Sequence, residues 1–206
     1  MVPSSAASTT PVIYELTSIL DRIDPGTLFP AQQPIELELG SGDGSFLVEY
    51  ARRHPDRNFF GVERLLGRLK KIERKSRRAG LTNVRAVRIE SAYFLRYLWP
   101  AHATTALHIY FPDPWPKRKH RRNRLVNEAF PLLAHTVLND NGTVFLRTDD
   151  ADYFAQMTSV FQASPLFQLI ETPTELAEVV TDFEREFQAR GVQTLRAAYK
   201  ALPVKS

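Results

Sequence analysis

The chain has 206 residues, 43% of them hydrophobic and 24% charged, which suits one domain, or one domain with a small appendage, around a full core. This apolar content and the low count of nine glycines exclude disordered and collagen-like proteins. The absence of cysteine excludes disulfides, thiolate metal ligands and thiol catalysis. No apolar run approaches the roughly 20 residues of a membrane span, and residues 1–10 contain no Lys or Arg. We therefore expect a cytoplasmic protein with no targeting peptide and no membrane partner.

The net charge of +4 hides a strong asymmetry along the chain. Residues 64–124 carry 17 Lys or Arg and three acidic residues, an excess of 14 positive charges. The remainder carries 10 basic and 20 acidic residues. Basic side chains concentrated on one part of a fold are typical of a protein that binds a polyanion. A solvated helix face rich in Lys and Arg would have the same composition, so charge alone leaves nucleic-acid binding open.

Seven short strands are predicted along the chain, separated mostly by helices. The expected strands are residues 35–39, 58–63, 84–89, 106–111, 143–147, 167–170 and 193–202. The expected helices run from Phe46 to near Pro55 and over residues 64–79, 93–98, 125–138, 150–161 and 181–188. This alternation predicts an α/β fold with a parallel, doubly wound sheet and helices on both faces. Such a sheet binds its ligands beyond the carboxyl ends of the strands.

The first thirty residues stand apart from this pattern. Residues 1–10 are rich in Ser, Ala and Thr and are expected to be disordered, whereas residues 11–20 are compatible with a helix. We therefore divide the chain into an N-terminal extension, residues 1–30, and a main domain, residues 31–206.

A glycine-rich loop follows the first predicted strand and opens a helix, as a nucleotide-binding turn requires. Its spacing, G-x-G-x-G over residues 40–44, differs from the dinucleotide fingerprint, which would place glycine where Ser45 stands. Glu38 precedes the loop and suits an ammonium group better than a pyrophosphate. Glu63 ends the second strand, where an acid accepts hydrogen bonds from ribose hydroxyls. Together these features favour S-adenosylmethionine, with a nicotinamide dinucleotide as the minor alternative.

The loop after the fourth strand contains three prolines in five residues, Pro112, Pro114 and Pro116, which fix φ and remove backbone donors. A loop stiffened in this way would hold Asp113 above the ligand site. Six of the eight residues from 117 to 124 are Lys or Arg. A proline-rich turn with a solvated basic tail has the same composition, and composition alone does not separate the two interpretations.

The run YFPDPWPKRKHRRNRL, with IELELGSGDGSF and FFGVE before it and TDFEREF after it, resembles the bacterial tRNA (guanine-N7)-methyltransferase family. The match runs in order over roughly residues 35–200, and the PDPWPK loop with its basic tail is its specific element. The resemblance implies a Rossmann-like class I methyltransferase domain with a seven-stranded, mostly parallel sheet and an antiparallel last strand. It also implies methyl transfer from S-adenosylmethionine, leaving S-adenosylhomocysteine, to N7 of a guanosine in the tRNA variable loop.

The resemblance also implies the residues of the site. Cofactor contacts fall on Glu38, Gly40, Gly42, Glu63, Glu90, Ser91 and Asp113. Family members usually have Asp-Ala where this chain has Glu90-Ser91. Substrate contacts fall on Lys117, Asp149, Thr181, Asp182, Phe183 and Glu184. Phosphate contacts are expected from the basic tail over residues 117–124, chiefly Arg118, Lys119, Arg121 and Arg122, and from the basic helix over residues 64–78.

Asp113 is the expected catalytic residue. Guanine N7 has a lone pair at neutral pH, so no general base is needed, and carboxylates that bind the purine edge would orient N7 towards the methyl group. We therefore expect Asp113 and Glu184 to bind guanine. The five histidines show no metal-ligand spacing, so no metal is expected. We expect a monomer or homodimer with no obligate protein partner.

Three alternatives remain beside this interpretation. The first is an S-adenosylmethionine enzyme with another target, although the basic segment argues against a small metabolite. The second is an RNA-binding module without catalysis, which a broken glycine loop or a missing acid after the fourth strand would favour. The third is a nicotinamide oxidoreductase, which Ser45 and the lack of an obvious catalytic Tyr/Lys pair disfavour.

Overall fold

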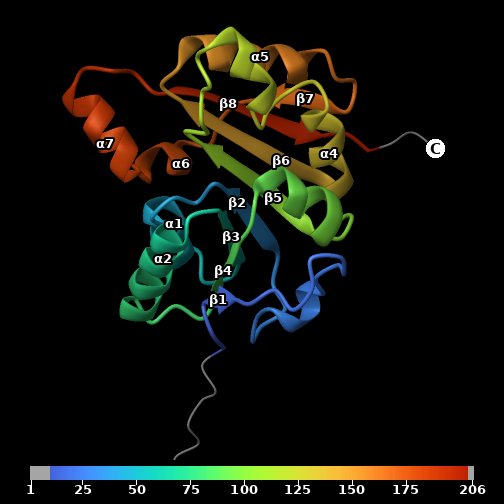
Figure 1. Cartoon of the computed structure of the whole chain (residues 1–206), viewed down its shortest axis with the longest axis vertical. Helices are drawn as coiled ribbons and strands as arrows, with labels where there is room; N and C mark the ends of the chain where they lie inside the picture. The colour runs from blue at the N-terminus through green and yellow to red at the C-terminus, as the bar shows by residue number, and fades with distance from the viewer. Residues whose placement is uncertain (1–9, 204–206) are drawn as a thin grey trace, which may run out of the picture.

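The computed structural model describes residues 10–203, within which eight strands form one sheet (Figure 1). Their order is β1-β4-β3-β2-β5-β6-β8-β7, with β8 antiparallel to both of its neighbours and the remaining pairs parallel. The strands are β1 Ile13–Tyr14, β2 Ile35–Leu39, β3 Asn58–Glu63, β4 Val84–Arg88, β5 Thr104–Tyr110, β6 Leu138–Thr148, β7 Phe167–Ile170 and β8 Leu195–Ala201. The predicted α/β fold with an antiparallel last strand is confirmed. The additional strand is β1, which pairs with β4 at the edge of the sheet.

The strand order reverses at β2, which lies between β3 and β5. In open α/β sheets a ligand binds at such a switch point, outside the carboxyl ends of the strands. The register places Leu39 opposite Val62 and Glu38 opposite His108. The loops that follow β2, β3 and β5 therefore leave the sheet side by side at this edge.

Two sets of helices cover the two faces of the sheet, each over its own apolar cluster. One face carries α1, α2 and α6, and the other carries η2, α4 and α5. Figure 1 shows α1 and α2 packed side by side beneath the glycine-rich loop. The bounds are α1 Ser45–Arg53, α2 Leu66–Arg78, α3 Ser91–Tyr93, η2 Phe94–Leu98, η3 Arg118–Asn123, α4 Phe130–Val137, α5 Ala151–Gln162, α6 Thr174–Glu178 and α7 Asp182–Ala189, with a 3-10 turn η1 at Pro25–Thr27. Within residues 10–203, no helix is long and apolar enough to cross a membrane.

Strand β3 illustrates how burial on both faces shapes the sequence. Phe59 points into the cluster under α1 and α2, and Phe60 points into the opposite cluster, so the strand is apolar without alternation. Gly61 is required by close packing, since a Cβ there would lie 2.7 Å from the side chains of both Leu47 and Ser41. The glycine-rich loop and α1 are therefore fixed directly against β3.

Three expected elements differ from the structure. The helix expected over residues 11–20 is wrong, because residues 13–14 form the edge strand β1 and Val12 O accepts a hydrogen bond from Ala86 N of the adjacent strand β4 (2.8 Å). The helix expected over 125–138 is confined to α4. The turn expected at Asn141 lies inside β6, with Asn141 at φ 64° and a shift of register on β5. Pairing with a neighbouring strand outweighs local preference in the first and third cases.

Candidate active site

The glycine-rich loop is held on β3 by its own backbone. Gly40 N and Ser41 N both donate to Val62 O, at 2.8 and 3.0 Å. Gly40 and Gly42 have φ of 79° and 56°, a region that favours glycine. A Cβ added at Gly40 would meet nothing within 4 Å, so the backbone there borders open space that a ligand can enter. The predicted loop thus has the shape that close approach of a ligand requires.

Glu63 organises this loop from the end of β3. Its two carboxylate oxygens accept from Gly42 N (2.9 Å) and Leu65 N (2.7 Å), and the side chain is buried. Each carboxylate oxygen has a second acceptor position, so a ribose hydroxyl can still donate to it. The expected cofactor role of Glu63 therefore fits the structure, with the additional task of holding the loop.

Glu38 lies at the end of β2 and is almost completely buried. Its Oε2 has no hydrogen-bond partner within the described residues. Burial raises the pKa of Glu38 to about 8, with Asp43 and Glu63 adding to the rise while Ser41 and Arg147 oppose it. A buried carboxyl with an unpaired oxygen is stabilised by a cation placed against it. The free acceptor oxygen at this position thus fits the ammonium group of an amino-acid ligand.

Glu90 and Ser91 follow β4, one strand further along the same edge. Glu90 accepts from Ala92 N (2.9 Å) and Tyr93 N (2.7 Å) and so caps α3, while remaining exposed. Ser91 is half-buried as the first residue of that helix. The structure therefore brings Glu90 to the expected edge, and its carboxylate is engaged in a helix cap there.

The proline-rich loop leaves β5 beside the glycine-rich loop, because β2 and β5 are parallel neighbours. Asp113 is exposed in it, as the prediction requires of a group that meets a substrate. Phe111 and Trp115 flank Asp113 with φ of 49° and 43°, which is unusual for bulky residues. Such conformations cost about 1–3 kcal/mol each and persist only where surrounding structure holds them.

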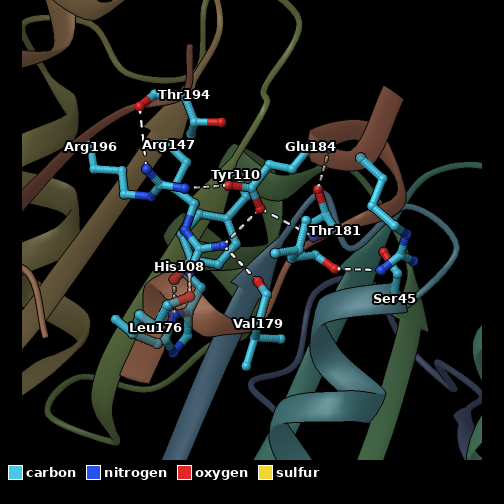
Figure 2. A network of polar contacts seen from close by, with 12 residues as sticks. Ser45, His108, Tyr110, Arg147, Leu176, Val179, Thr181, Glu184, Thr194 and Arg196 are labelled. Carbon is cyan, nitrogen blue, oxygen red and sulfur yellow. Dashed lines mark hydrogen bonds and ion pairs between the residues drawn. The ribbon is translucent and has the colours of Figure 1, made fainter. Parts of the chain in front are cut away.

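A buried polar network joins β6 to the segment that carries α6 and α7 (Figure 2). Arg147 donates to Glu184 Oε2 and Val179 O, both at 2.9 Å, and also to Leu176 O. Its guanidinium lies 4.1 Å from the centre of the Tyr110 ring. Arg147 therefore connects strand, helix and the base of the proline-rich loop at one point.

Glu184 lies at the centre of this network and is completely buried. Arg196 donates to its Oε1 (2.8 Å), Arg147 and Thr181 N donate to its Oε2, and Thr181 Oγ1 accepts from Glu184 N in a capping box. Both carboxylate oxygens are thus engaged inside the protein. The expectation that Glu184 binds guanine does not fit this arrangement, because the carboxylate would have to leave two arginines to reach a base.

The remaining substrate candidates lie at the same end of the sheet or near it. Asp149 follows β6 and is half-buried, and Lys117 is exposed before η3. Asp182 N donates to Ser45 Oγ (3.3 Å), and its carboxylate lies 3.7 Å from Lys75 Nζ, which also pairs with Asp43 (2.7 Å). The start of α7 is thereby attached to the glycine-rich loop. The side chain of Phe183 lies outside the described residues.

The basic tail has two parts with different environments. Arg118, Lys119, Arg121 and Arg122 are exposed on η3, as phosphate contacts must be, and Arg121 pairs with Asp152 (2.9 Å). Arg124 instead has a side chain only 1% exposed. The tail is therefore a surface feature only as far as residue 123.

Sequence reasoning missed Arg147 as part of the site, and it assigned Arg124 and Lys75 only to the phosphate-contacting tail and helix. One signal was present for Arg147: it is the single charged residue in the apolar run from 143 to 148, and a buried arginine needs a partner. A cavity of about 810 Å³ also lies between α1, α2 and α7, with Ser45, Lys75 and Asp182 in its lining. Its lining also includes Gly44, the last glycine of the glycine-rich loop.

The comparisons with known proteins agree with this architecture. Residues 32–197 match a family described as putative methyltransferases. Three curated proteins named tRNA (guanine-N(7)-)-methyltransferase are similar to the chain. The one from Thermotoga maritima is 33% identical over 84% of this chain, the one from Myxococcus xanthus 31% over 80%, and the one from Lactobacillus delbrueckii 30% over 89%. The matches cover 55%, 82% and 91% of those proteins. The chain thus spans about half the length of the Thermotoga relative.

Solved structures with little sequence identity share the fold. The 16S rRNA methyltransferase KamB superposes with a TM-score of 0.60 at 16% identity, over 83% of this chain and 89% of that one. TrmN from Thermus thermophilus gives 0.58 at 18% identity, over 82% and 45%.

The doubly wound sheet, its antiparallel last strand and the glycine-rich loop at the switch point define a class I methyltransferase, which the matches support independently. More specifically, the chain belongs to the tRNA (guanine-N(7)-)-methyltransferase family. The family resemblance drawn from the sequence is confirmed.

Proposed function

We propose that the protein transfers a methyl group from S-adenosylmethionine to N7 of a guanosine in the variable loop of tRNA. The observation that carries this proposal is the convergence of two features at one edge of the sheet: the unpaired buried carboxyl of Glu38 and the exposed carboxylate of Asp113. The first suits a cationic amino-acid ligand, and the second suits the donor edge of guanine. The names of the curated relatives support the same reaction and substrate.

The cofactor would be held by backbone and carboxylates around the switch point. Glu38 would accept a hydrogen bond from the ammonium group of the cofactor, and Glu63 would accept hydrogen bonds from its ribose hydroxyls. The open space at Gly40 would admit the amino-acid part of the cofactor. When bound, S-adenosylmethionine supplies a methyl group on a positively charged sulfur. Glu90, with its carboxylate engaged in the cap of α3, would border the adenine through Ser91 and the adjoining backbone.

Asp113 would orient the guanine. Its exposed carboxylate can accept from N1–H and the N2 amine, which adenine does not offer in that pattern. A negative charge at this edge also stabilises the positive charge that the purine acquires as N7 is methylated. Because the N7 lone pair is available at neutral pH, Asp113 binds and positions and does not remove a proton.

In this proposal Glu184 has a structural role, whereas the sequence indicated that it binds guanine. Its buried pairing with Arg147 and Arg196 would fix the start of α7, so that Asp182 and the adjoining backbone face the substrate. Lys117 and Asp149, at the edge of the site, would make the remaining polar contacts with the nucleotide. The exposed cations of η3 and α2 would contact tRNA phosphates, which position the RNA without reading its sequence.

The test is to incubate the protein with S-adenosylmethionine and unmodified tRNA, digest the RNA and analyse its nucleosides by mass spectrometry. We expect N7-methylguanosine with the wild type and a rate about 100- to 1,000-fold lower with Asp113→Ala, the usual cost of losing one oriented electrostatic group. Asp140→Ala, which removes an exposed carboxylate near the start of β6, is the matched control and should keep the wild-type rate. Methylation of another base would contradict the guanine assignment, and no methylation would contradict the reaction.

A further inference from the structure

The last arginine of the basic tail, Arg124, has an environment unlike that of its neighbours. The residues of η3 before it are exposed or half-exposed, whereas the Arg124 side chain is 1% exposed. A side chain buried to this degree does not offer its charge to a phosphate backbone in solvent. Its position between a proline-rich loop and α5 gives it other partners.

The guanidinium of Arg124 makes three directed hydrogen bonds. Nε donates to Pro114 O in the proline-rich loop (2.7 Å). The two terminal nitrogens donate to Gln156 Oε1 (2.8 Å) and Asp152 Oδ2 (2.6 Å), both on α5, and the group lies 4.7 Å from the centre of the Tyr153 ring. The hydrogen bond from Arg124 lowers the pKa of Asp152, so that partner stays ionised. One side chain thus ties the loop to a helix of the core.

The carbonyl that Arg124 holds lies at a critical place in the loop. Pro114 directly follows Asp113 and precedes Trp115, which has a positive φ, as Phe111 does. Strained backbone of this kind relaxes unless contacts hold it. The prolines restrict φ within the loop, but they supply no bond that fixes the loop to the rest of the protein. The contact from Nε to Pro114 O is such a bond.

We infer that Arg124 is the positioning residue of the Asp113 loop, and that it does not belong to the RNA-contacting cations. This inference rests on the proposed function, because it assigns Arg124 to the placement of the proposed catalytic carboxylate. Arginine is required here since its planar fork reaches a carbonyl and two acceptors on α5 at once. Lysine at this position keeps the charge, but its single nitrogen does not reach Pro114 O and the two acceptors on α5 at the same time.

The test compares Arg124→Lys with Arg85→Lys as a matched control. Arg85 is also buried, donates to Leu28 O (2.8 Å) and Val84 O (2.7 Å), and lies 5.4 Å from the centre of the Phe29 ring, in β4 far along the sheet from the proline-rich loop. Both substitutions remove a buried guanidinium, so both carry a similar cost in stability. A role that is merely structural would affect the two variants alike.

Two readouts separate positioning from stability. The first is acrylamide quenching of tryptophan fluorescence, which reports on Trp115 because the other tryptophan, Trp99, is completely buried. The second is the split between kcat and the KM for tRNA. We expect Arg124→Lys to increase the quenching and to lower kcat by about 10- to 100-fold with KM within about twofold, the scale of a displaced catalytic group. Arg85→Lys should leave both readouts unchanged.

Three outcomes would overturn the inference. Unchanged quenching and kcat in Arg124→Lys would show that the loop is held without Arg124. A tRNA affinity that falls together with a smaller salt dependence would make Arg124 a phosphate contact. Equal changes in Arg85→Lys would make the effect one of stability. If the wild type itself methylates no tRNA, the proposed function fails, while the quenching of Trp115 still decides whether Arg124 holds the loop.

Discussion

At the scale of single residues, Glu38 is a carboxylic acid whose burial favours its protonated form. Burial raises its pKa to about 8 from a usual value of 4.5. Between these values the folded chain holds a proton that the unfolded chain releases. The contribution of Glu38 to stability is therefore fully present below about pH 4.5 and is lost as the pH rises to about 8.

We therefore predict that Glu38→Gln reduces the fall in stability between about pH 5 and 8. Glutamine has the shape of the protonated acid and does not titrate, so its Tm should decline less steeply with pH than that of the wild type. The measurement is thermal unfolding of both proteins over this range, in the absence of ligand. Parallel curves would show that Glu38 is already ionised at pH 5.

A second prediction concerns ligand binding. If the ammonium group of S-adenosylhomocysteine pairs with Glu38, it stabilises the ionised carboxylate, so binding to the wild type at neutral pH should release a proton. Calorimetry in two buffers would detect this release.

The position of a side chain at a strand end is easier to predict from the sequence than its distant hydrogen-bond partners. Glu38 and Glu63 could be placed because their chemistry depends on a strand end and a local loop, which are readable within a few residues. Glu184 could not, since its arginines come from β6 and β8, 37 and 12 residues away. A contact of that kind depends on how the strands pair, and no local pattern reports it.

At the scale of elements, α7 shows how a short helix can be held in place by one buried charge. Its eight residues are too few for a stable isolated helix, so tertiary contacts must fix it. The capping box orders its first turn, and the pairing of Glu184 with Arg147 fastens that turn to the sheet (Figure 2). The position of the start of α7 thus depends on this pair.

We predict that Glu184→Gln is strongly destabilising. Removing one partner of a buried ion pair leaves the other charge uncompensated and costs about 3–5 kcal/mol. For a domain of this size, that corresponds to a fall in Tm of roughly 6–20 °C. Glu186→Gln, an exposed glutamate on the same helix, is the control and should change Tm by no more than about 2 °C. Loss of activity with an unchanged Tm in Glu184→Gln would instead support direct contact with guanine.

Strands β2, β3 and β7 have the limits predicted from the sequence. β2 and β3 are buried along their whole length, whereas β7 lies at the edge of the sheet and only Phe167 in it is buried. The helix predicted for the residues before α4 is wrong because contacts with another helix fix their conformation. Val126 N donates to Tyr153 Oη (2.9 Å), and Gln156 Nε2 donates to Val126 O. A periodic apolar pattern continues through that stretch, but the contacts from α5 hold it in a non-helical form.

At the scale of the whole molecule, the charge asymmetry is reduced but not removed by folding. Of the 17 cations between residues 64 and 124, Arg85 and Arg124 lie inside the fold. The remainder include the exposed side chains of α2 and η3, whereas the acidic residues Glu38, Glu63 and Glu184 are buried. Folding thus hides much of the negative charge around the site and leaves the positive charge outside, where an RNA can meet it.

This distribution of charge predicts that tRNA binding weakens as the salt concentration rises. Each tRNA phosphate neutralised by the protein releases counterions, so the logarithm of the binding constant should fall linearly with the logarithm of salt concentration. We expect Lys119→Glu and Arg122→Glu each to weaken binding of every tRNA to a similar degree and to reduce the slope by about one. Arg52→Glu, a reversal of the same sign on α1 outside the basic segment, controls for net charge. If Arg52→Glu has an equal effect, the attraction is a property of total charge; if the η3 variants alone respond, phosphates are bound at η3 and the RNA approaches the site from the side of the Asp113 loop.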